Sequence, residues 1–168
     1  LHKEYRRQRQ MCIRDSSDTG GGAGDFKRWA LDHYLVLADL LKNHLGGSAD
    51  FTFVLGPDEG NMRDRIHRLG RRDFKIEFCR TVKELAALMH NARLVVSNDC
   101  GPSHIAQGLC VPYVGVFNEP NPEWFWKRRY TRDVVPDNSM AEINSIVPAR
   151  VYGHAWTSSS NPDFRETG

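Results

Sequence analysis

Apolar residues in the middle of the chain follow two spacings that alternate along it. From residue 31 to residue 45 they fall three or four positions apart, which predicts an amphipathic helix that ends before Gly46 and Gly47. The run FTFVL that follows, residues 51–55, predicts a strand. The alternation then continues, with helices expected around 62–69, 82–89 and 102–109, and strands around 74–78, 93–97 and 113–117. Strands separated by helices pair in parallel through right-handed crossovers. The pattern therefore predicts an α/β fold, a Rossmann-like parallel sheet with helices on both faces.

Two local signals refine this pattern. Phe74, Ile76 and Phe78 alternate with charged residues, which predicts a half-buried strand near an edge of the sheet. The sequence T-x-x-E from Thr81 to Glu84 predicts a capping box at the start of the next helix. The inner face of that helix is expected to consist of Val82, Leu85, Ala86 and Met89.

The two ends of the chain lack both spacings. Residues 1–18 are strongly basic, which predicts a disordered arm, and the stretch RQMCIRDS within them also resembles translated library-adapter sequence, an origin that would make the arm non-native. Residues 156–168 are polar and predict a mobile tail, so one domain is expected over 19–155. Because the loop TGGGAGDFKRW follows the arm rather than a strand, the first strand of the sheet is expected to be missing.

Composition narrows the function classes. The net charge of +2 argues against a general attraction to nucleic acids or membranes. The four cysteines form no CxxC pair and have no histidine at metal-ligand spacing, which indicates reduced thiols in a cytoplasmic protein and no metal site. No apolar run approaches the ~20 residues of a membrane span.

The glycine-rich loop TGGGAGDFKRW, residues 19–29, has two interpretations. It fits neither the G-x-G-x-x-G dinucleotide pattern nor the Walker A pattern, because Asp25 and Lys27 stand where glycine is needed and Phe26 precedes the lysine. It is either a flexible linker or a loop whose backbone approaches a phosphate while Lys27 supplies positive charge.

The loop SNDCGPSH, residues 97–104, joins an expected strand to an expected helix. Gly101 allows close approach of the backbone, Pro102 suits a first helical turn, and N–H groups at the start of a helix bind anions. The alternative is an ordinary turn in which Asp99 or Ser103 caps the helix. His104 is either a packed histidine or a functional one.

The segment NPEWFWKRRY, residues 121–130, combines aromatic and basic residues. Such a segment can stack the bases of single-stranded nucleic acid. The alternative is that Trp124 and Trp126 pack the loop back onto the domain, which leaves the basic residues in solvent.

Three motifs, taken together and in this order, resemble a known family: KRW, then LGPDE, then TVKELAALMHNARLVVSNDCGPSHIAQGLCVPYVGVF. They resemble the heptosyltransferase-like glycosyltransferases, the ADP-heptose:lipopolysaccharide heptosyltransferase family, over about Gly20 to Ala155. The resemblance is to the C-terminal, donor-binding half of these enzymes and implies the C-terminal domain of a GT-B glycosyltransferase.

The resemblance also implies donor-binding roles for particular residues. Lys27 would pair with the donor's diphosphate, and Gly22 and Ala23 would touch the same phosphates. Glu59, or Asp58 one position earlier, would accept hydrogen bonds from the ribose hydroxyls. Four positions of SNDCGPSH would hold the pyrophosphate and orient the sugar: Asp99, Cys100, Gly101 and His104.

The sequence departs from the family pattern at three places. The loop Gly20–Gly24 lacks the hydroxyl residues often found there, Cys100 stands where serine or threonine is usual, and FNEPNP at 117–122 replaces F-G-P-T-x-P. Arg80 falls at the adenine-facing position, where the family contact is usually apolar or made by the backbone. Asn118 and Glu119 in FNEPNP put the identity of the donor sugar in question.

The implied function is metal-independent transfer of a sugar from a nucleotide-diphosphate sugar. The expected sugar is heptose, from a donor of the ADP-heptose type, and the expected acceptor is a lipopolysaccharide-like, lipid- or glycan-linked molecule at the inner membrane face. The base that activates the acceptor would lie on a missing N-terminal domain, so the chain is expected to be inactive alone. Two alternatives stay open, a noncatalytic nucleotide-binding module and a single-stranded nucleic-acid binder.

Overall fold

A single parallel sheet organises the computed structural model, which describes residues 10–14, 27–45, 50–56 and 60–159. The sheet has six strands in the order β3-β2-β1-β4-β5-β6, and every neighbouring pair is parallel. The strands are β1 (Gln10–Arg14), β2 (Asp50–Leu55), β3 (Lys75–Phe78), β4 (Ala92–Asn98), β5 (Tyr113–Val116) and β6 (Thr131–Val134). The helices are α1 (Leu31–His44), α2 (Gly60–Arg68), α3 (Val82–His90), α4 (Gly101–Gly108) and α5 (Pro148–Ser159), with a short 3-10 turn, η2 (Ile143–Ser145).

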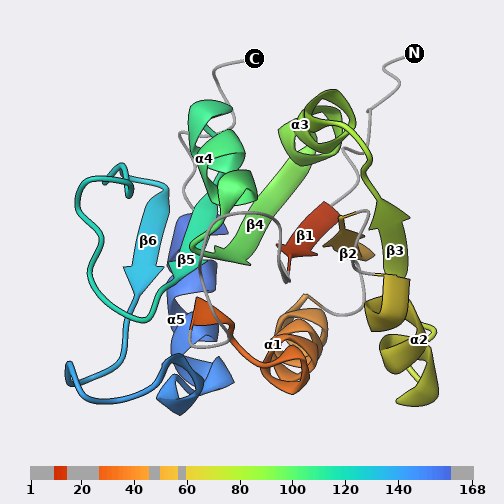
Figure 1. Ribbon diagram of the computed structural model, residues 1–168, viewed down its shortest axis with the longest axis horizontal. Helices are drawn as coiled ribbons and strands as arrows, with labels where there is room; N and C mark the ends of the chain where they lie inside the picture. The colour runs from red at the N-terminus through yellow and green to blue at the C-terminus, as the bar shows by residue number, and fades with distance from the viewer. Residues whose placement is uncertain (1–9, 15–26, 46–49, 57–59, 160–168) are drawn as a thin grey trace.

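Helices cover both faces of this sheet, as the sequence predicted (Figure 1). Helices α1, α2 and α5 pack on one face, where Leu94 and Val96 of β4 point, and α3 and α4 pack on the other, where Val95 points. Successive side chains of a strand alternate between the faces, so a strand buried on both sides is apolar throughout. This explains the unbroken apolar run Leu94, Val95 and Val96 in the middle of β4.

The expectation that the first strand is missing is wrong. Residues 10–14, which were assigned to a disordered arm, form β1 in the centre of the sheet, where Met11 pairs with Phe51 of β2 and with Leu94 of β4. A strand between two others satisfies N–H and C=O groups on both of its neighbours, and this backbone requirement leaves no mark on the local apolar pattern. The rest of residues 1–18 lies outside the described residues.

The predictions for the edges of the sheet and for the end of the chain are confirmed in one case and wrong in others. Strand β3 lies at an edge, as predicted. Strand β6 forms the opposite edge and was not predicted, because only its first and last residues, Thr131 and Val134, are buried. Helix α5 extends to Ser159, so 156–159 are helical rather than part of a tail.

The capping box at the start of α3 is present in a modified form. Thr81 Oγ1 accepts the N–H of Glu84 at 3.2 Å, and Glu84 Oε2 accepts the N–H of Arg80 at 2.8 Å rather than that of Thr81. Leu85 and Met89 are buried as expected, Ala86 is half-buried, and Val82 is wrongly placed on the inner face because it is 69% exposed. Helical Cα–Cβ bonds tilt toward the N-terminus, so a first-turn side chain points past the end of the helix.

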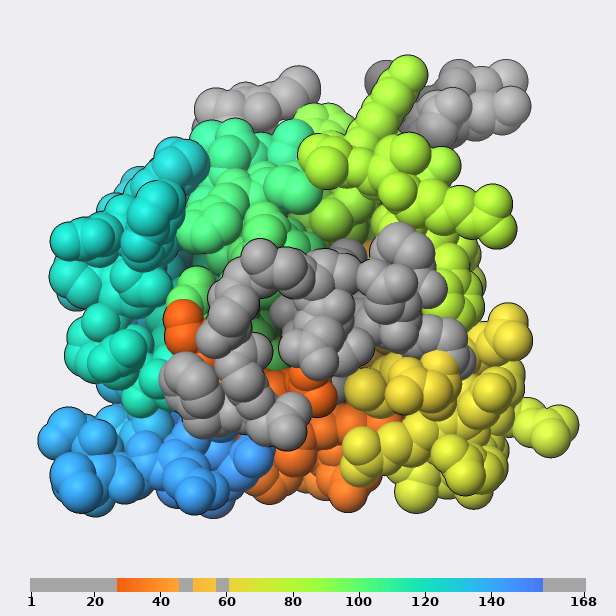
Figure 2. Space-filling view, viewed as in Figure 1, coloured from red at the N-terminus to blue at the C-terminus, as the bar shows by residue number. Residues whose placement is uncertain are grey.

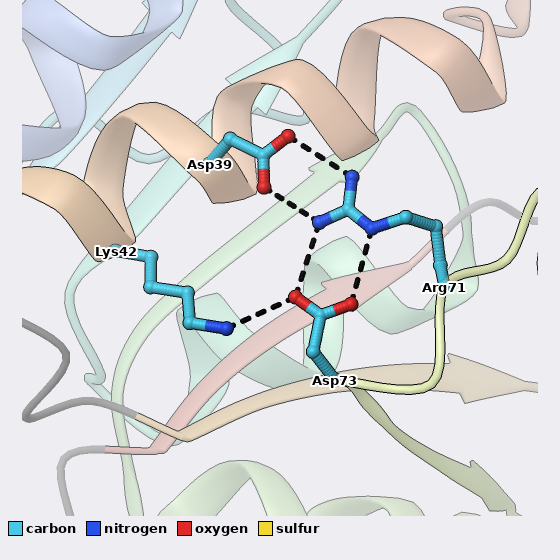
Figure 3. A network of polar contacts seen from close by, with 4 residues as sticks. All are labelled: Asp39, Lys42, Arg71 and Asp73. Carbon is cyan, nitrogen blue, oxygen red and sulfur yellow. Dashed lines mark hydrogen bonds and ion pairs between the residues drawn. The ribbon is translucent and has the colours of Figure 1, made fainter.

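A network of four charged side chains ties α1 to the turn that precedes β3 (Figure 3). Arg71 donates to both carboxylate oxygens of Asp39, at 2.9 and 2.6 Å, and to both of Asp73, at 3.1 and 3.2 Å. Lys42 adds a 3.0 Å contact to Asp73. We call these residues the Arg71 network. Its bidentate geometry fixes the turn against the helix.

Candidate functional site

The strand order defines where a ligand would bind. In the order 3-2-1-4-5-6 the chain moves outward from β1 in one direction and then starts again at β4 in the other, so the order reverses between β1 and β4. Open α/β sheets bind ligands in the crevice outside the carboxyl ends of the strands at such a reversal. The loop that follows β4 begins at Asp99 and therefore lies at this position.

Lys27 and Asp99 form an ion pair at this reversal. Lys27 Nζ lies 3.0 Å from Asp99 Oδ2, and the two side chains are 31% and 17% exposed. Asn121 Nδ2 lies 3.4 Å from the same carboxylate oxygen. The structure thus brings together two predicted site residues that are 72 positions apart in the sequence. Their partial exposure leaves the ammonium and the carboxylate accessible to a polar ligand.

Asn98, which was not among the predicted site residues, holds the KRW segment against β4. Its side chain is 2% exposed, and Oδ1 accepts the backbone N–H of Trp29 at 3.3 Å and the hydroxyl of Tyr34 at 2.7 Å. Trp29 is fixed further by its indole N–H, which donates to the carbonyl of Ile146 at 2.8 Å. Lys27 precedes Trp29 by two positions, so these bonds place its side chain near Asp99. The signal in the sequence was a polar residue that ends an apolar strand.

The turn from β4 into α4 leaves the start of the helix without a side-chain cap. Cys100 occupies the N-cap position with extended backbone and makes no capping bond, so the alternative that Asp99 or Ser103 caps the helix is wrong. Ser103 Oγ instead donates to the carbonyl of Cys100 at 2.7 Å. A Cβ built on Gly101 would meet nothing within 4 Å. As far as the described residues go, the first turn of α4 therefore offers backbone N–H groups and the positive end of a helix dipole beside open space, which suits an anion.

A buried hydroxyl pair lies under this turn. Ser97 Oγ and Tyr113 Oη are 3.2 Å apart, and both residues are fully buried. Burial raises the pKa of Tyr113 far above its ordinary value, and the nearby Cys100 and Asp99 act in the same direction. The tyrosine therefore stays a neutral hydroxyl that supports the turn.

The segment from residue 121 to residue 130 does not pack as expected. Phe125 is the aromatic residue that enters the core, at 7% exposure, while Trp124 and Trp126 are 58% and 45% exposed. The prediction that the two tryptophans pack the loop onto the domain is wrong. Arg128 lies over Trp126, and its Nη1 donates to the carbonyl of Gln107 at 2.8 Å. This engagement argues against Arg128 as a contact for nucleic-acid phosphates.

His104, in the first turn of α4, contacts one of these exposed tryptophans. The ring centroids of His104 and Trp124 are 5.5 Å apart at an interplanar angle of 66°. Asn121 and Trp124 were not among the predicted site residues, yet both lie beside them. The signal for Asn121 was its place in FNEPNP, which departs from the family pattern, and the signal for Trp124 was its place in the aromatic and basic segment 121–130.

Four predicted positions cannot be placed. Gly22, Ala23, Glu59 and its alternative Asp58 lie outside the described residues. Arg80 is described and exposed, and its backbone N–H takes part in the cap of α3.

Two observations on the described residues 10–14, 27–45, 50–56 and 60–159 bear on metal binding and on membrane insertion. Within those ranges, no three His, Cys, Asp or Glu side chains gather as they would around a metal ion. None of the helices described there has the length and apolar character to span a bilayer.

Comparison of the sequence with models of known protein families shows which family the chain belongs to. Residues 18–141 match the model described as glycosyltransferase family 9 (heptosyltransferase). The chain belongs to glycosyltransferase family 9. The family resemblance of the sequence motifs is thereby confirmed, and membership supports a role in sugar transfer. No curated protein sequence gives a significant match.

Solved structures show the same fold for this family 9 chain. The E. coli ADP-heptose lipopolysaccharide heptosyltransferase II matches with a TM-score of 0.69 and 17% identity, over 89% of this chain and 46% of that one. E. coli heptosyltransferase WaaC with ADP matches with a TM-score of 0.67 and 18% identity, over 92% and 46%. A family 9 glycosyltransferase from Veillonella parvula DSM 2008 gives 0.67 and 21%, over 90% and 46%. The chain thus spans about half the length of these structures, and the expected Rossmann-like domain of a GT-B glycosyltransferase is confirmed.

In this family 9 chain, the cysteine of the SNDCGPSH loop makes a hydrogen bond within the turn. Cys100, at a position where the family pattern has serine or threonine, donates its Sγ–H to the carbonyl of Asn98 at 3.2 Å. A thiol is a weak donor, so this bond orders the turn less strongly than a hydroxyl would. Asn118 is half-buried and Glu119 is exposed in the other departing segment.

Proposed function

We propose that this chain is the donor-binding half of a metal-independent glycosyltransferase. The donor would be a nucleotide-diphosphate sugar of the ADP-heptose type, and the transferred sugar heptose. One observation carries the proposal: Lys27 and the uncapped start of α4 meet where the strand order reverses. Family membership and the ADP or ADP-heptose named for two of the similar structures support the choice of donor.

The chemistry of these groups suits the breaking of a sugar–diphosphate bond. Negative charge develops on the leaving diphosphate, and an ammonium with backbone N–H groups at a helix start stabilises such charge without a metal. The donor's phosphate would compete with Asp99 for the Lys27 ammonium. Once released, the Asp99 carboxylate would be available to accept a hydrogen bond from a sugar hydroxyl.

The remaining parts of the reaction are assigned to another domain. The acceptor site and the base that deprotonates the acceptor hydroxyl would lie on an N-terminal domain, and the acceptor would be a lipopolysaccharide-like molecule at the cytoplasmic face of the inner membrane. We therefore expect this chain to bind donor and to transfer nothing by itself.

Titration with ADP tests the proposed site. Lys27→Ala removes a charge-assisted contact to the diphosphate, which is typically ~1.5–3 kcal/mol, so ADP should bind about 10- to 100-fold more weakly in calorimetry. Lys75→Ala is the matched control, because Lys75 pairs with Asp50 at 3.2 Å on the β2–β3 edge of the sheet. Equal ADP affinity in the wild type and Lys27→Ala would refute the site.

A noncatalytic nucleotide-binding module is the second candidate, because Lys27 and the start of α4 suit diphosphate binding whether or not a transfer follows. It predicts the same ADP binding. The two candidates separate when the N-terminal half of a family 9 enzyme is added to the chain together with ADP-heptose and an acceptor. Sugar transfer would establish the enzyme, and persistent absence of transfer despite donor binding would favour the module.

A further inference from the structure

Trp124 exposes its indole beside the candidate site. Its side chain is 58% exposed, whereas the adjacent Phe125 is 7% exposed. An indole left in water forgoes the large free-energy gain that burial of an aromatic side chain provides. Exposure of this kind is informative when it occurs at a site rather than on a featureless surface.

The backbone that carries Trp124 is firmly held. Gln107 of α4 is fully buried, and its amide donates Nε2–H to the carbonyl of Trp124 at 3.1 Å and accepts the N–H of Trp126 at 2.6 Å. The backbone on both sides of Phe125 is therefore fixed to α4 by one side chain. Two further bonds, from the N–H groups of Trp124 and Phe125 to the carbonyl of Asn121, complete a tight turn. The exposure of the indole is thus a feature of an ordered segment.

This segment reaches the Lys27–Asp99 pair. Its first residue, Asn121, lies within 3.4 Å of Asp99, and the Trp124 ring lies against His104 in the first turn of α4. Figure 2 shows the surface of the segment between β5 and β6, in teal, directly beside that of α4, in green. A group attached to a phosphate at the start of α4 on the side of His104 would lie next to the indole.

The two exposed tryptophans of the segment differ in what covers them. The guanidinium of Arg128 lies 5.3 Å from the centre of the Trp126 ring, a cation–π contact that occupies one face. Trp124 contacts the His104 ring in a T-shaped arrangement. Within the described chain, Trp124 is the more exposed of the two.

We infer that Trp124 stacks against the sugar ring of the bound donor and thereby determines which sugar the site accepts. A sugar ring has an apolar face of C–H groups and a rim of hydroxyls. The indole matches the face, and the Asp99 carboxylate and the Asn121 amide match the rim. The inference rests on the proposed nucleotide-sugar function and adds a specificity-determining residue to it.

The test compares ADP-heptose with ADP, because the two ligands differ by the sugar. Calorimetry with the 168-residue chain should show tighter binding of ADP-heptose than of ADP. Trp124→Ala should remove most of this advantage, about tenfold by the size of an aromatic stacking contact plus its buried area, while ADP affinity stays unchanged. Trp124→Phe should keep most of the advantage, and Trp126→Ala, the control, should keep all of it.

The outcomes separate this inference from the proposed function. No binding of either ligand to the wild type would refute the nucleotide-sugar function. Binding of ADP with an ADP-heptose advantage that Trp124→Ala leaves intact would overturn the inference alone. An equal loss for both ligands would also overturn it, because the indole would then contact the nucleotide. If Trp124→Ala unfolds, as judged by circular dichroism, Trp124→Phe and Trp124→His replace it. Retention of the ADP-heptose advantage in Trp124→Phe together with its loss in Trp124→His would support stacking, and any other pattern would oppose it.

Discussion

The Lys27–Asp99 pair and the Arg71 network are both clusters of opposite charge, but they differ in how fully the charges are matched. In the network, Arg71 makes two bonds to each of two carboxylates, and its guanidinium also lies 4.3 Å from the centre of the Phe74 ring. At the candidate site, within the described residues, the Lys27 ammonium pairs with the single carboxylate of Asp99, at 3.0 Å. An added anion would therefore bind only weakly to Arg71, whose donors are already engaged, and more strongly to Lys27.

Location reinforces this difference. The Arg71 network joins α1 to a turn and connects elements that are already adjacent (Figure 3). The Lys27–Asp99 pair lies at the reversal of the strand order, beside a helix start without a side-chain cap. A cluster of charged residues alone therefore does not identify a binding site. What identifies one is a charged group that can still accept a further partner, at a position in the fold where ligands bind.

Removal of the Asn98 amide should have the largest effect on stability and on ADP binding, because its hydrogen bonds hold the segment that carries Lys27. Asn98→Ala leaves the N–H of Trp29 and the hydroxyl of Tyr34 without their buried acceptor, at a typical cost of about 1–3 kcal/mol for each unsatisfied group. We expect the free energy of unfolding in urea to fall by roughly 2–4 kcal/mol and ADP to bind more weakly. Tyr34→Phe, which removes one bond, is the milder control. Unchanged ADP affinity in folded Asn98→Ala would show that Asn98 does not position Lys27.

Removal of Arg71 should affect stability and leave the site intact. Arg71→Ala breaks the contacts to Asp39 and Asp73 and the stacking on Phe74, and because the carboxylates are partly exposed we expect a loss of about 1–2 kcal/mol in the free energy of unfolding. ADP affinity should stay within about twofold, by the rule that distant sites act independently. Arg72→Ala, at the exposed neighbouring position, controls for loss of charge. A large drop in ADP affinity would contradict the separation of the two clusters.

Acid should weaken the Arg71 network through Asp73. Hydrogen bonds from Arg71, opposed by partial burial and assisted by Lys42, hold the pKa of Asp73 well below its ordinary value. A carboxyl with a depressed folded-state pKa contributes stability above its unfolded pKa of about 4 and loses that contribution as the pH falls toward the folded value. Thermal unfolding between about pH 5 and pH 2 should therefore show a decline that is smaller in Asp73→Asn. Parallel pH profiles for the two proteins would contradict this assignment.

Neutralisation of Asp99 should have the smallest effect of the four changes. Whether ADP affinity rises or falls is nevertheless informative about the role of the carboxylate. Asp99→Asn frees the Lys27 ammonium and removes a negative charge from the proposed diphosphate site, so ADP should bind a few-fold more tightly at low salt, on the order of 1 kcal/mol for a partly exposed pair. Calorimetry at two salt concentrations measures this. Weaker binding would mean that the carboxylate itself supports the nucleotide.

The elements that could be predicted from the sequence are those whose buried face produces a regular spacing of apolar residues. The spacing of apolar residues in α1 and the runs in β2 and β4 follow from helical and strand geometry against a core, so they appear in the sequence. The capping box at Thr81 is local in the same way. Motif resemblance added Lys27, Asp99 and the family, because order and spacing along the chain are themselves sequence properties.

The tertiary structure decided what depends on neighbours distant in sequence. Residues 10–14 became the central strand because β2 and β4 both require a partner for their backbone groups, and that requirement does not depend on the side chains of β1. The buried amide of Gln107 decided that Phe125 enters the core and that Trp124 faces solvent beside His104. Asn98 gained its role only when Trp29 and Tyr34 folded against it. The sequence determined which segments are helices or buried strands and where the motifs lie, whereas partners for backbone and polar groups come from other elements and exist only once those elements are packed together.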